Sequence, residues 1–272
     1  MKNGTIRISV LDLMSRLQKL PFSLQKSLKK GSLLKIIGGL DNFDEDSVVN
    51  IAKASALGGG DLIDIACDAG LVKAALQVSS LPVCVSAVDP QLFPSAVEAG
   101  ASLIEIGNFD SFYAKGRFFE SAEVLALTTE TRRLIPDVFL SVTVPHFLPL
   151  DQQAQLGLDL VEAGADLIQT EGGKSSTPHN PGVRGLIEKA APTLAAVHTI
   201  SQAFSRADCQ IPIMCASGLS AVTAPLAIAA GASGVGIGSA VNRLSSEIEM
   251  IAMIKTLRES IDYSPLFVPQ TA

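Results

Sequence analysis

Cysteine and histidine are scarce in this 272-residue sequence, and neither is arranged as a disulfide framework or a metal centre. The residues concerned are Cys67, Cys84, Cys209, Cys215, His146, His179 and His198. No two of these cysteines are close neighbours, and no two histidines have ligand spacing, so a disulfide scaffold and a zinc centre are disfavoured. Three of the cysteines lie in or beside apolar segments, and we expect buried free thiols in a reducing compartment. A thiol or redox role through Cys67 is a weaker alternative.

The sequence also lacks a hydrophobic run long enough to span a membrane. Hydrophobic residues make up 47% of the chain and the mean hydropathy is +0.36. The most apolar stretch, 221–232, is nevertheless short and contains Pro225. Short strands that are buried on both faces explain the excess. The N-terminus has no apolar signal core and runs directly into a predicted strand at Leu33, so we expect a location in the cytosol or an organelle stroma.

Positive charge is not in excess over the whole chain, which disfavours nucleic-acid binding. The formal net charge is −6 and the pI is near 5.1. Residues 1–35 are the exception, with eight Lys and Arg against one acidic residue, Asp12. Leucines recur there at Leu13, Leu17, Leu20 and Leu24. This pattern predicts an N-terminal helical extension, 1–30, that caps the following domain, or alternatively a surface for a partner or for a homo-oligomer.

One pattern occurs four times: the end of a helix, a Gly-Ala or Gly-Gly step, and a short apolar strand. The four copies lie at 59–65, 98–106, 162–169 and 230–238. Glycine ends a helix readily because it adopts the left-handed conformation without a steric penalty. Strands that alternate with helices at this rhythm predict parallel βαβ units.

Four further apolar segments bring the predicted strands to eight, and they lie at 33–38, 82–87, 139–144 and 211–216. Helices are predicted at 46–57, about 68–77, 92–99, 121–134, 151–163, 186–204, 221–230 and 240–261. Eight strands with internal repetition predict one α/β domain, a (β/α)₈ TIM barrel over 31–262, with an irregular tail at 263–272. An open dinucleotide-binding sheet is weaker, because Ser239 and Val241 stand where its glycine motif needs glycine.

Charged residues occupy the middle of several apolar strands. Lys35, Asp64, Glu105 and Gln169 fall at one position of the aligned repeats, where side chains point into a barrel. Lys35 could form a Schiff base or neutralise an anionic substrate, with a proton moved by Asp64 or Glu105. Neighbouring carboxylates would hold Lys35 protonated, which favours electrostatic work. Glu171, beside the sixth strand, joins these candidate catalytic residues. A structural salt-bridge layer that fills the barrel is the alternative.

Small residues follow the seventh and eighth strands. Their backbone N–H groups can approach a phosphate closely, and Ser239 can also begin the last helix. The candidate phosphate-binding residues are Gly172, Gly173, Ser217, Gly218, Gly238 and Ser239. The loop after the sixth strand is long and polar, and it is a candidate lid in which Lys174 could reach a phosphate. The alternatives are glycines needed only for tight turns and a mobile surface loop.

No motif requires a cofactor. An acidic loop follows the first strand, at Asp41, Asn42, Asp44, Glu45 and Asp46. It is typical of a helix N-terminus, where acidic side chains are favoured, and a Mg²⁺ site is a weaker alternative. His146 follows the fifth strand and could face the same end of the barrel.

Three stretches, 34–43, 63–68 and 169–173, resemble one family. It is named for hypothetical chloroplast reading frame twenty-three and is found in cyanobacteria and algal plastids. The resemblance covers nearly the whole chain after about residue 30, and it implies an aldolase-type barrel, a photosynthetic host, and a cytoplasmic or plastid-stromal location. The resemblance brings no established substrate or catalytic residues, so it assigns no role to Lys35 or Asp64. More distantly, the repeats and the last glycines are similar to thiazole synthase and sugar-phosphate epimerase barrels, a likeness of fold and phosphate site alone.

These features favour a small enzyme, a lyase, isomerase or synthase, that acts on a small phosphorylated carbonyl metabolite. The alternative is a non-catalytic barrel that binds such a metabolite and regulates a partner through the basic N-terminal helix.

Overall fold

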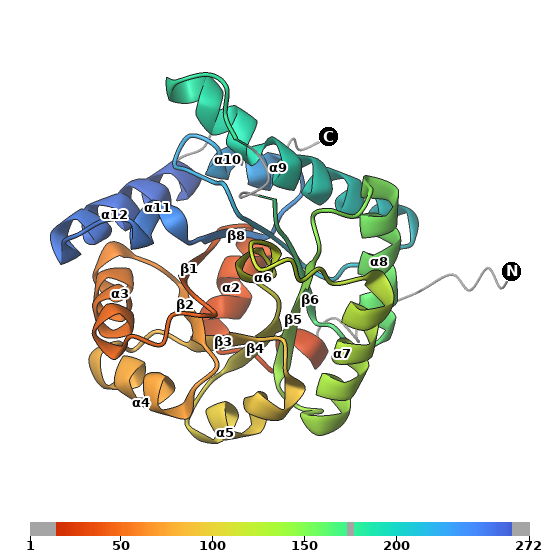
Figure 1. Cartoon of the computed structure of the whole chain (residues 1–272), viewed down its shortest axis with the longest axis horizontal. Coiled ribbons are helices and arrows are strands. Elements are labelled where there is room, and N and C mark those ends of the chain that lie inside the picture. Colours follow the sequence, from red (N-terminus) through yellow and green to blue (C-terminus); the bar gives the residue numbers. More distant parts are fainter. Residues whose placement is uncertain (1–14, 173–176, 263–272) are drawn as a thin grey trace, which may run out of the picture.

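The structure, a computed structural model, describes residues 15–172 and 177–262. Eight parallel strands close into one barrel in sequence order, with β1 beside β8 (Figure 1). The strands are β1 (Leu33–Gly39), β2 (Leu62–Ala66), β3 (Val83–Ala87), β4 (Leu103–Ile106), β5 (Phe139–Val144), β6 (Leu167–Thr170), β7 (Ile213–Ala216) and β8 (Gly234–Ile237). The prediction of a (β/α)₈ TIM barrel is confirmed.

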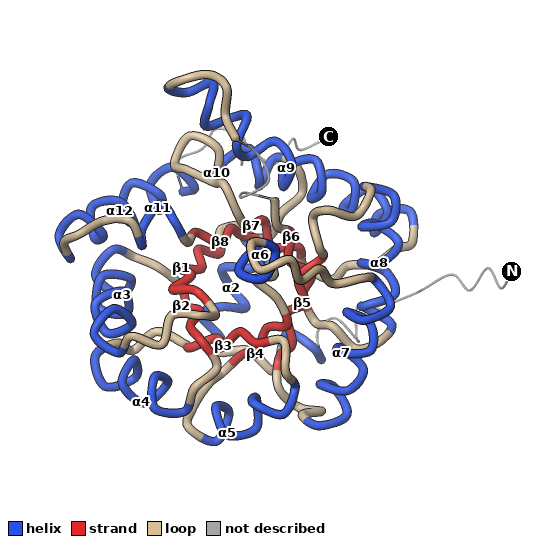
Figure 2. The backbone as a smooth tube through the Cα atoms, in the orientation of Figure 1, coloured by secondary structure: helices blue, strands red, loops and turns tan. Residues whose placement is uncertain are grey.

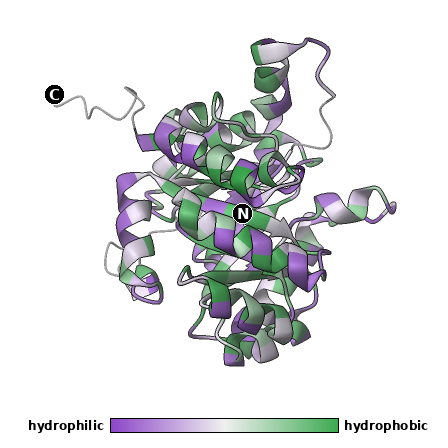
Figure 3. Ribbon diagram, turned by 90° about the vertical axis from the view of Figure 1, so that its left-hand side faces the viewer, coloured by the Kyte–Doolittle hydropathy of each residue, from purple (hydrophilic) through white to green (hydrophobic). Residues whose placement is uncertain are grey.

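Helices between the strands form the outer ring, as Figure 2 shows. They are α3 (Glu45–Gly58), α4 (Ala69–Val78), α5 (Phe93–Glu98) after a 3₁₀ turn η1 (Pro90–Leu92), α7 (Ser121–Leu134), α8 (Leu150–Glu162), α9 (Gly182–Arg206), α10 (Ala224–Ala229), α11 (Ser239–Asn242) and α12 (Glu247–Asp262). The outer helices carry both hydrophobic and hydrophilic residues (Figure 3). Their apolar residues pack with outward-facing strand residues into one buried core. Among the described residues, every helix is too short or too polar to cross a bilayer.

Two helices lie across the ends of the barrel rather than in the ring: α2 (Phe22–Lys30) and α6 (Asp110–Tyr113). The lower lumen and the N-terminal segment share an apolar cluster of Leu17, Leu20, Leu24, Leu28, Leu33, Leu62, Cys84, Leu103, Phe139, Leu167 and Met214. Arg16 donates to the carbonyl of Ala165 at 2.5 Å, and Lys19 pairs with Asp166 at 3.3 Å. Residues 15–30 therefore close the bottom of the barrel and use two of their basic side chains to do so.

The prediction of one continuous helix over 240–261 is wrong, because α11 ends at Asn242 and α12 begins at Glu247. Ser246 and Glu249 hold the start of α12 by reciprocal hydrogen bonds. The Ser246 hydroxyl accepts from the Glu249 N–H at 3.3 Å, and the Glu249 carboxylate accepts from the Ser246 N–H at 3.2 Å. This capping box satisfies the first amides of a new helix, so the chain turns there instead of continuing.

Candidate active site

The carboxyl ends of the strands surround a cavity of about 770 Å³. Its wall comes from segments at the ends of β1, β4, β6, β7 and β8. The candidate residues of the lumen and of the phosphate site that lie on this wall are Gln169, Glu171, Ser217, Gly218, Gly238 and Ser239. This is the end at which barrels of this type carry their active sites.

One side of the cavity is lined by residues whose backbone N–H groups have no acceptor in the part of the chain that the structure describes. Within residues 15–172 and 177–262, the amides of Gly218, Leu219, Ser239 and Ala240 donate to no protein atom. Gly218 has a φ of 72° and the preceding Ser217 a φ of 71°. Two consecutive left-handed residues make a tight turn that only glycine adopts freely, and strain at a residue such as Ser217 is typical of functional sites. Four free amides in two adjacent turns can bind an anion.

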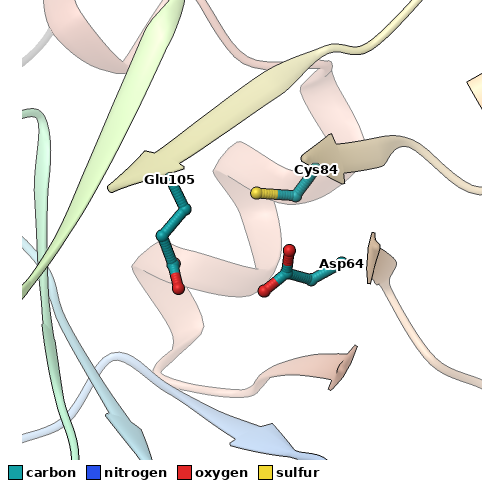
Figure 4. Close-up of side chains that lie close together, drawn as sticks. All are labelled: Asp64, Cys84 and Glu105. Atoms are coloured by element: carbon teal, nitrogen blue, oxygen red, sulfur yellow. The ribbon is translucent and has the colours of Figure 1, made fainter. Parts of the chain in front are cut away.

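A hydrogen-bonded layer lies deeper in the lumen, and we call it the inner layer: Lys35, Asp64 and Glu105. The Lys35 ammonium lies 2.6 Å from Glu105 and 3.2 Å from Asp64. Figure 4 shows the two carboxylates and the Cys84 thiol pointing toward one another from neighbouring strands. Glu105 also accepts from Ser141 at 2.7 Å.

The inner layer is closed to the cavity. Its three residues are at most 2% exposed, and none of them lines the cavity wall. Burial would lower the pKa of Lys35, but the charges of Asp64 and Glu105 outweigh it, so the pKa lies above its usual range. Lys35 therefore stays protonated and is a poor amine for Schiff-base formation. The arrangement can fill the barrel and set the electrostatic field beneath the cavity.

Asn108 connects the inner layer to the cavity. It follows β4 and lines the wall, and its side-chain amide donates to Ser86 at 3.1 Å and to Asp64 at 3.4 Å. Ser86 in turn donates to the other Asp64 oxygen at 2.5 Å. Asn108 has a φ of 61°, a left-handed conformation that asparagine tolerates better than most residues.

A second group of ionisable side chains lies at the rim, and we call it the rim cluster: Asp110, Tyr113, His146 and Glu171. The Tyr113 hydroxyl donates to Oε1 of Glu171, which also accepts from the backbone N–H of His146 at 3.2 Å. Nδ1 of His146 lies 3.2 Å from Glu171 Oε1 and 3.8 Å from Asp110 Oδ1. Ser217 donates to the other oxygen of Asp110 at 3.0 Å, which joins this cluster to the turn after β7.

Burial and neighbouring charges shift the pKa values of two residues in the rim cluster. Desolvation raises the pKa of Glu171, and the nearby charge of Asp110 raises it further. For His146, burial acts to lower the pKa, but the hydrogen bond to Glu171 and the two carboxylates outweigh it and raise the pKa. Glu171 is only 3% exposed although it lines the cavity. The rim cluster thus brings together two carboxyl groups, an imidazole and a phenol, a set that can hold or move protons.

The remaining sequence-predicted residues have other surroundings. Gly172 is buried against α9, where an added Cβ would lie 3.0 Å from Pro192, and it is not on the cavity wall. Gly173 and Lys174 lie outside the described residues. In the acidic loop, Asp44 accepts from the Ser47 N–H at 3.2 Å and begins α3, whereas Asp41 lines the cavity.

All four cysteines are free and buried, as the sequence predicts. Burial, with the charges of Asp68 and Asp89, raises the pKa of the Cys67 thiol to about 12. An uncharged buried thiol is a weak nucleophile, so the structure gives a redox role for Cys67 no support.

Sequence reasoning missed Asp110, Tyr113 and Asn108. All three follow β4, at the end of the barrel where active sites collect, so their position was a usable signal. The short helix α6 was not predicted, and it is α6 that brings Asp110 and Tyr113 to His146 and Glu171.

Comparisons with solved structures agree with this architecture. The chain is similar to 3-hexulose-6-phosphate synthase, with 16% identity, a TM-score of 0.59, and coverage of 84% of this chain and 99% of that chain. It is also similar to (S)-3-O-geranylgeranylglyceryl phosphate synthase from Thermoplasma acidophilum in complex with sn-glycerol-1-phosphate. That match has 15% identity, a TM-score of 0.58, and coverage of 88% and 97%. Likeness at this identity shows the fold alone.

Sequence comparisons identify the family. A protein of Cyanophora paradoxa described as "Uncharacterized protein ycf23" is 44% identical over 238 residues, which cover 87% of this chain and 96% of the relative. A protein of Porphyra purpurea with the same description is 37% identical, with 88% of both chains covered. The model of the family described as "Protein of unknown function (DUF561)" matches residues 18–266. The resemblance predicted from the sequence is confirmed, and the chain belongs to the DUF561 family.

Proposed function

We propose that this protein is an enzyme, a lyase, isomerase or synthase, that acts on a small phosphorylated carbonyl metabolite. One observation carries the proposal: a single cavity is lined both by the buried residue Glu171 and by four residues after β7 and β8 whose backbone amides have no acceptor among the described residues. An anion site next to buried ionisable groups is what such a reaction requires, because one part holds the substrate and the other handles developing charge.

The phosphate is placed at the turns that contain Gly218 and Ser239. Their amides can donate to phosphate oxygens, and the exposed Ser239 side chain can add a hydroxyl donor. Arg243 lines the same cavity and supplies positive charge. The similar structures described above, 3-hexulose-6-phosphate synthase and (S)-3-O-geranylgeranylglyceryl phosphate synthase, are named for phosphorylated compounds, and they support this placement only by analogy.

The chemistry is placed at the rim cluster. Glu171, His146 and Tyr113 contact one another, so they can stabilise charge on the substrate carbonyl or transfer its proton. In this proposal the inner layer does not touch substrate; Lys35, Asp64 and Glu105 instead hold Asn108 and the floor of the cavity in place. The location that goes with this proposal is the cytoplasm of a cyanobacterium or the stroma of a plastid. Both are reducing compartments, in which four free thiols persist.

The test is a thermal-stability screen with matched ligand pairs, each phosphorylated metabolite beside its dephosphorylated form. Phosphorylated members should raise the melting temperature and their partners should not, because a ligand stabilises the folded state it binds. Ser239→Asp places a negative charge at the anion site and should abolish the shift. Ser80→Asp, an exposed change just before β3 at the opposite end of the barrel, is the matched control and should retain it. Equal stabilisation by both members of each pair would contradict the proposal.

A further inference from the structure

Three side chains of metal-ligand type meet at the rim of the cavity from three different elements. Asp110 is on α6, His146 follows β5, and Glu171 follows β6. One donor atom from each residue lies within 4.8 Å of the others, and His146 Nδ1 is 3.8 Å from Oδ1 of Asp110 and 3.2 Å from Oε1 of Glu171. Ligands about 2.1 Å from one cation lie on the order of 3 to 4 Å apart, so small side-chain movements would complete a coordination shell.

A second observation points to a ligand at this place. Oδ1 of Asp110 and Oε2 of Glu171 are buried, and neither has a hydrogen-bond partner within the described residues. Buried carboxylate oxygens are rarely left in this state, because removing them from water without a donor is costly. Glu171 is 3% exposed and lines the cavity, so its free oxygen is enclosed and yet adjacent to the space that a ligand would occupy.

The inner layer shows what such a cluster looks like when its cation is part of the protein. Asp64, Cys84 and Glu105 also offer ligand atoms within 4.8 Å of one another (Figure 4). The Lys35 ammonium occupies that position, 2.6 Å from Glu105 and 3.2 Å from Asp64. That cluster therefore needs no metal. At the rim, within residues 15–172 and 177–262, Asp110 and Glu171 form ion pairs only with His146, which is itself a metal ligand when neutral.

We propose that Asp110, His146 and Glu171 bind a divalent first-row transition cation, such as Mn²⁺ or Zn²⁺, beside the anion site. Two carboxylates and one imidazole favour such ions over Mg²⁺, which prefers oxygen ligands alone. Three protein ligands leave coordination positions for water or a substrate oxygen. The Tyr113 hydroxyl and the His146 N–H both donate to Oε1 of Glu171, and this orients the carboxylate so that Oε2 is available to the cation.

Metal binding itself does not depend on the proposed function, but the use of the cation does. If the protein acts on a phosphorylated carbonyl compound, the cation polarises the carbonyl oxygen as a Lewis acid. Glu171 then acts as a ligand that holds the cation rather than as a proton carrier. The phosphate site, formed by the turns after β7 and β8, remains separate.

The experiment is isothermal titration of the EDTA-treated full chain with MnCl₂, ZnCl₂ and MgCl₂, with folding checked by thermal melts. We expect one site per chain for Mn²⁺ or Zn²⁺, and affinity at least tenfold weaker in Asp110→Asn, His146→Gln and Glu171→Gln. Asp151→Asn and Glu162→Gln, at exposed positions of α8, are the matched controls and should bind as the unaltered chain does. Mn²⁺ bound to the unaltered chain should increase the relaxation rate of water protons, because water occupies its open coordination positions. This contribution of bound Mn²⁺ should be lost in the three variants.

Absence of binding by the unaltered chain would overturn the proposal, and so would binding that survives in all three variants. Mg²⁺ binding of equal strength would overturn the assignment to a transition cation. The phosphate screen is repeated in EDTA to keep the two proposals apart. A phosphate-dependent shift without metal binding refutes the cation site alone, and metal binding without a phosphate-dependent shift refutes the proposed substrate class alone.

Discussion

The inner layer and the rim cluster contain the same types of carboxylate group, yet they are completed in different ways. In the inner layer, Lys35 supplies a positive charge to both Asp64 and Glu105, and every residue is sealed from the cavity. In the rim cluster, Asp110 and Glu171 each retain a buried oxygen without a hydrogen-bond partner within the described residues, and both line the cavity. A buried charged group whose hydrogen bonds and ion pairs are complete stabilises the fold. A buried charged group that lacks a hydrogen-bond partner and lies beside a cavity is suited to binding a ligand.

The largest effect is expected from removing the cation of the inner layer. Lys35→Met leaves Asp64 and Glu105 buried without their partner, and we expect a loss of about 3–5 kcal/mol in the free energy of unfolding. Urea unfolding measures it. Lys29→Met, at an exposed position of α2, is the control and should change stability little. If Lys35→Met is as stable as the control, the inner layer is not a structural unit and a catalytic Lys35 regains support.

The opposite sign is expected at the rim. Glu171→Gln removes a buried charge whose Oε2 has no hydrogen-bond donor among the described residues, while the amide oxygen of Gln can still accept from the Tyr113 hydroxyl and the His146 N–H. The metal-free protein should therefore keep its stability or gain about 1 kcal/mol. Urea unfolding in EDTA, with Glu162→Gln as the control, measures this difference. A loss as large as that of Lys35→Met would mean that Glu171 holds the fold together, and the contrast between the two clusters would fail.

A loss of intermediate size is expected at Asn108, which connects the inner layer to the cavity. Asn108→Gly loses the hydrogen bonds to Ser86 and Asp64 but accepts the φ of 61° freely, so we expect a loss of about 1 kcal/mol. Asn108→Ala adds the left-handed strain of a residue with a Cβ and should lose about 1 kcal/mol more. Urea unfolding of both variants tests this. Equal losses would show that the backbone at Asn108 carries no strain.

Much of the fold could be predicted because it depends on local and periodic features. The Gly-Ala steps at 100–101 and 164–165 precede β4 and β6, because glycine ends a helix where a left-handed residue is needed. Strand alternation placed Lys35, Asp64 and Glu105 at one level of the lumen, and the structure brings their side chains together there. The break between α11 and α12 was missed because the apolar pattern continues through it, while the Ser246–Glu249 capping box decides it locally.

The candidate site was less predictable because its parts come from distant segments. Glu171 and the small residues after β7 and β8 could be selected by position along the chain. Nothing local showed that α6 would carry Asp110 and Tyr113 over the barrel mouth to Glu171.

Local sequence patterns are sufficient to specify the barrel, because glycine steps and alternating strands act through backbone conformation and nearest-neighbour burial. Which charged residues are sealed and which line the cavity depends instead on the packing of distant segments. Burial and pairing are properties of side chains brought together from distant segments. They distinguish Lys35, held between two carboxylates, from Glu171, whose Oε2 has no hydrogen-bond partner among the described residues.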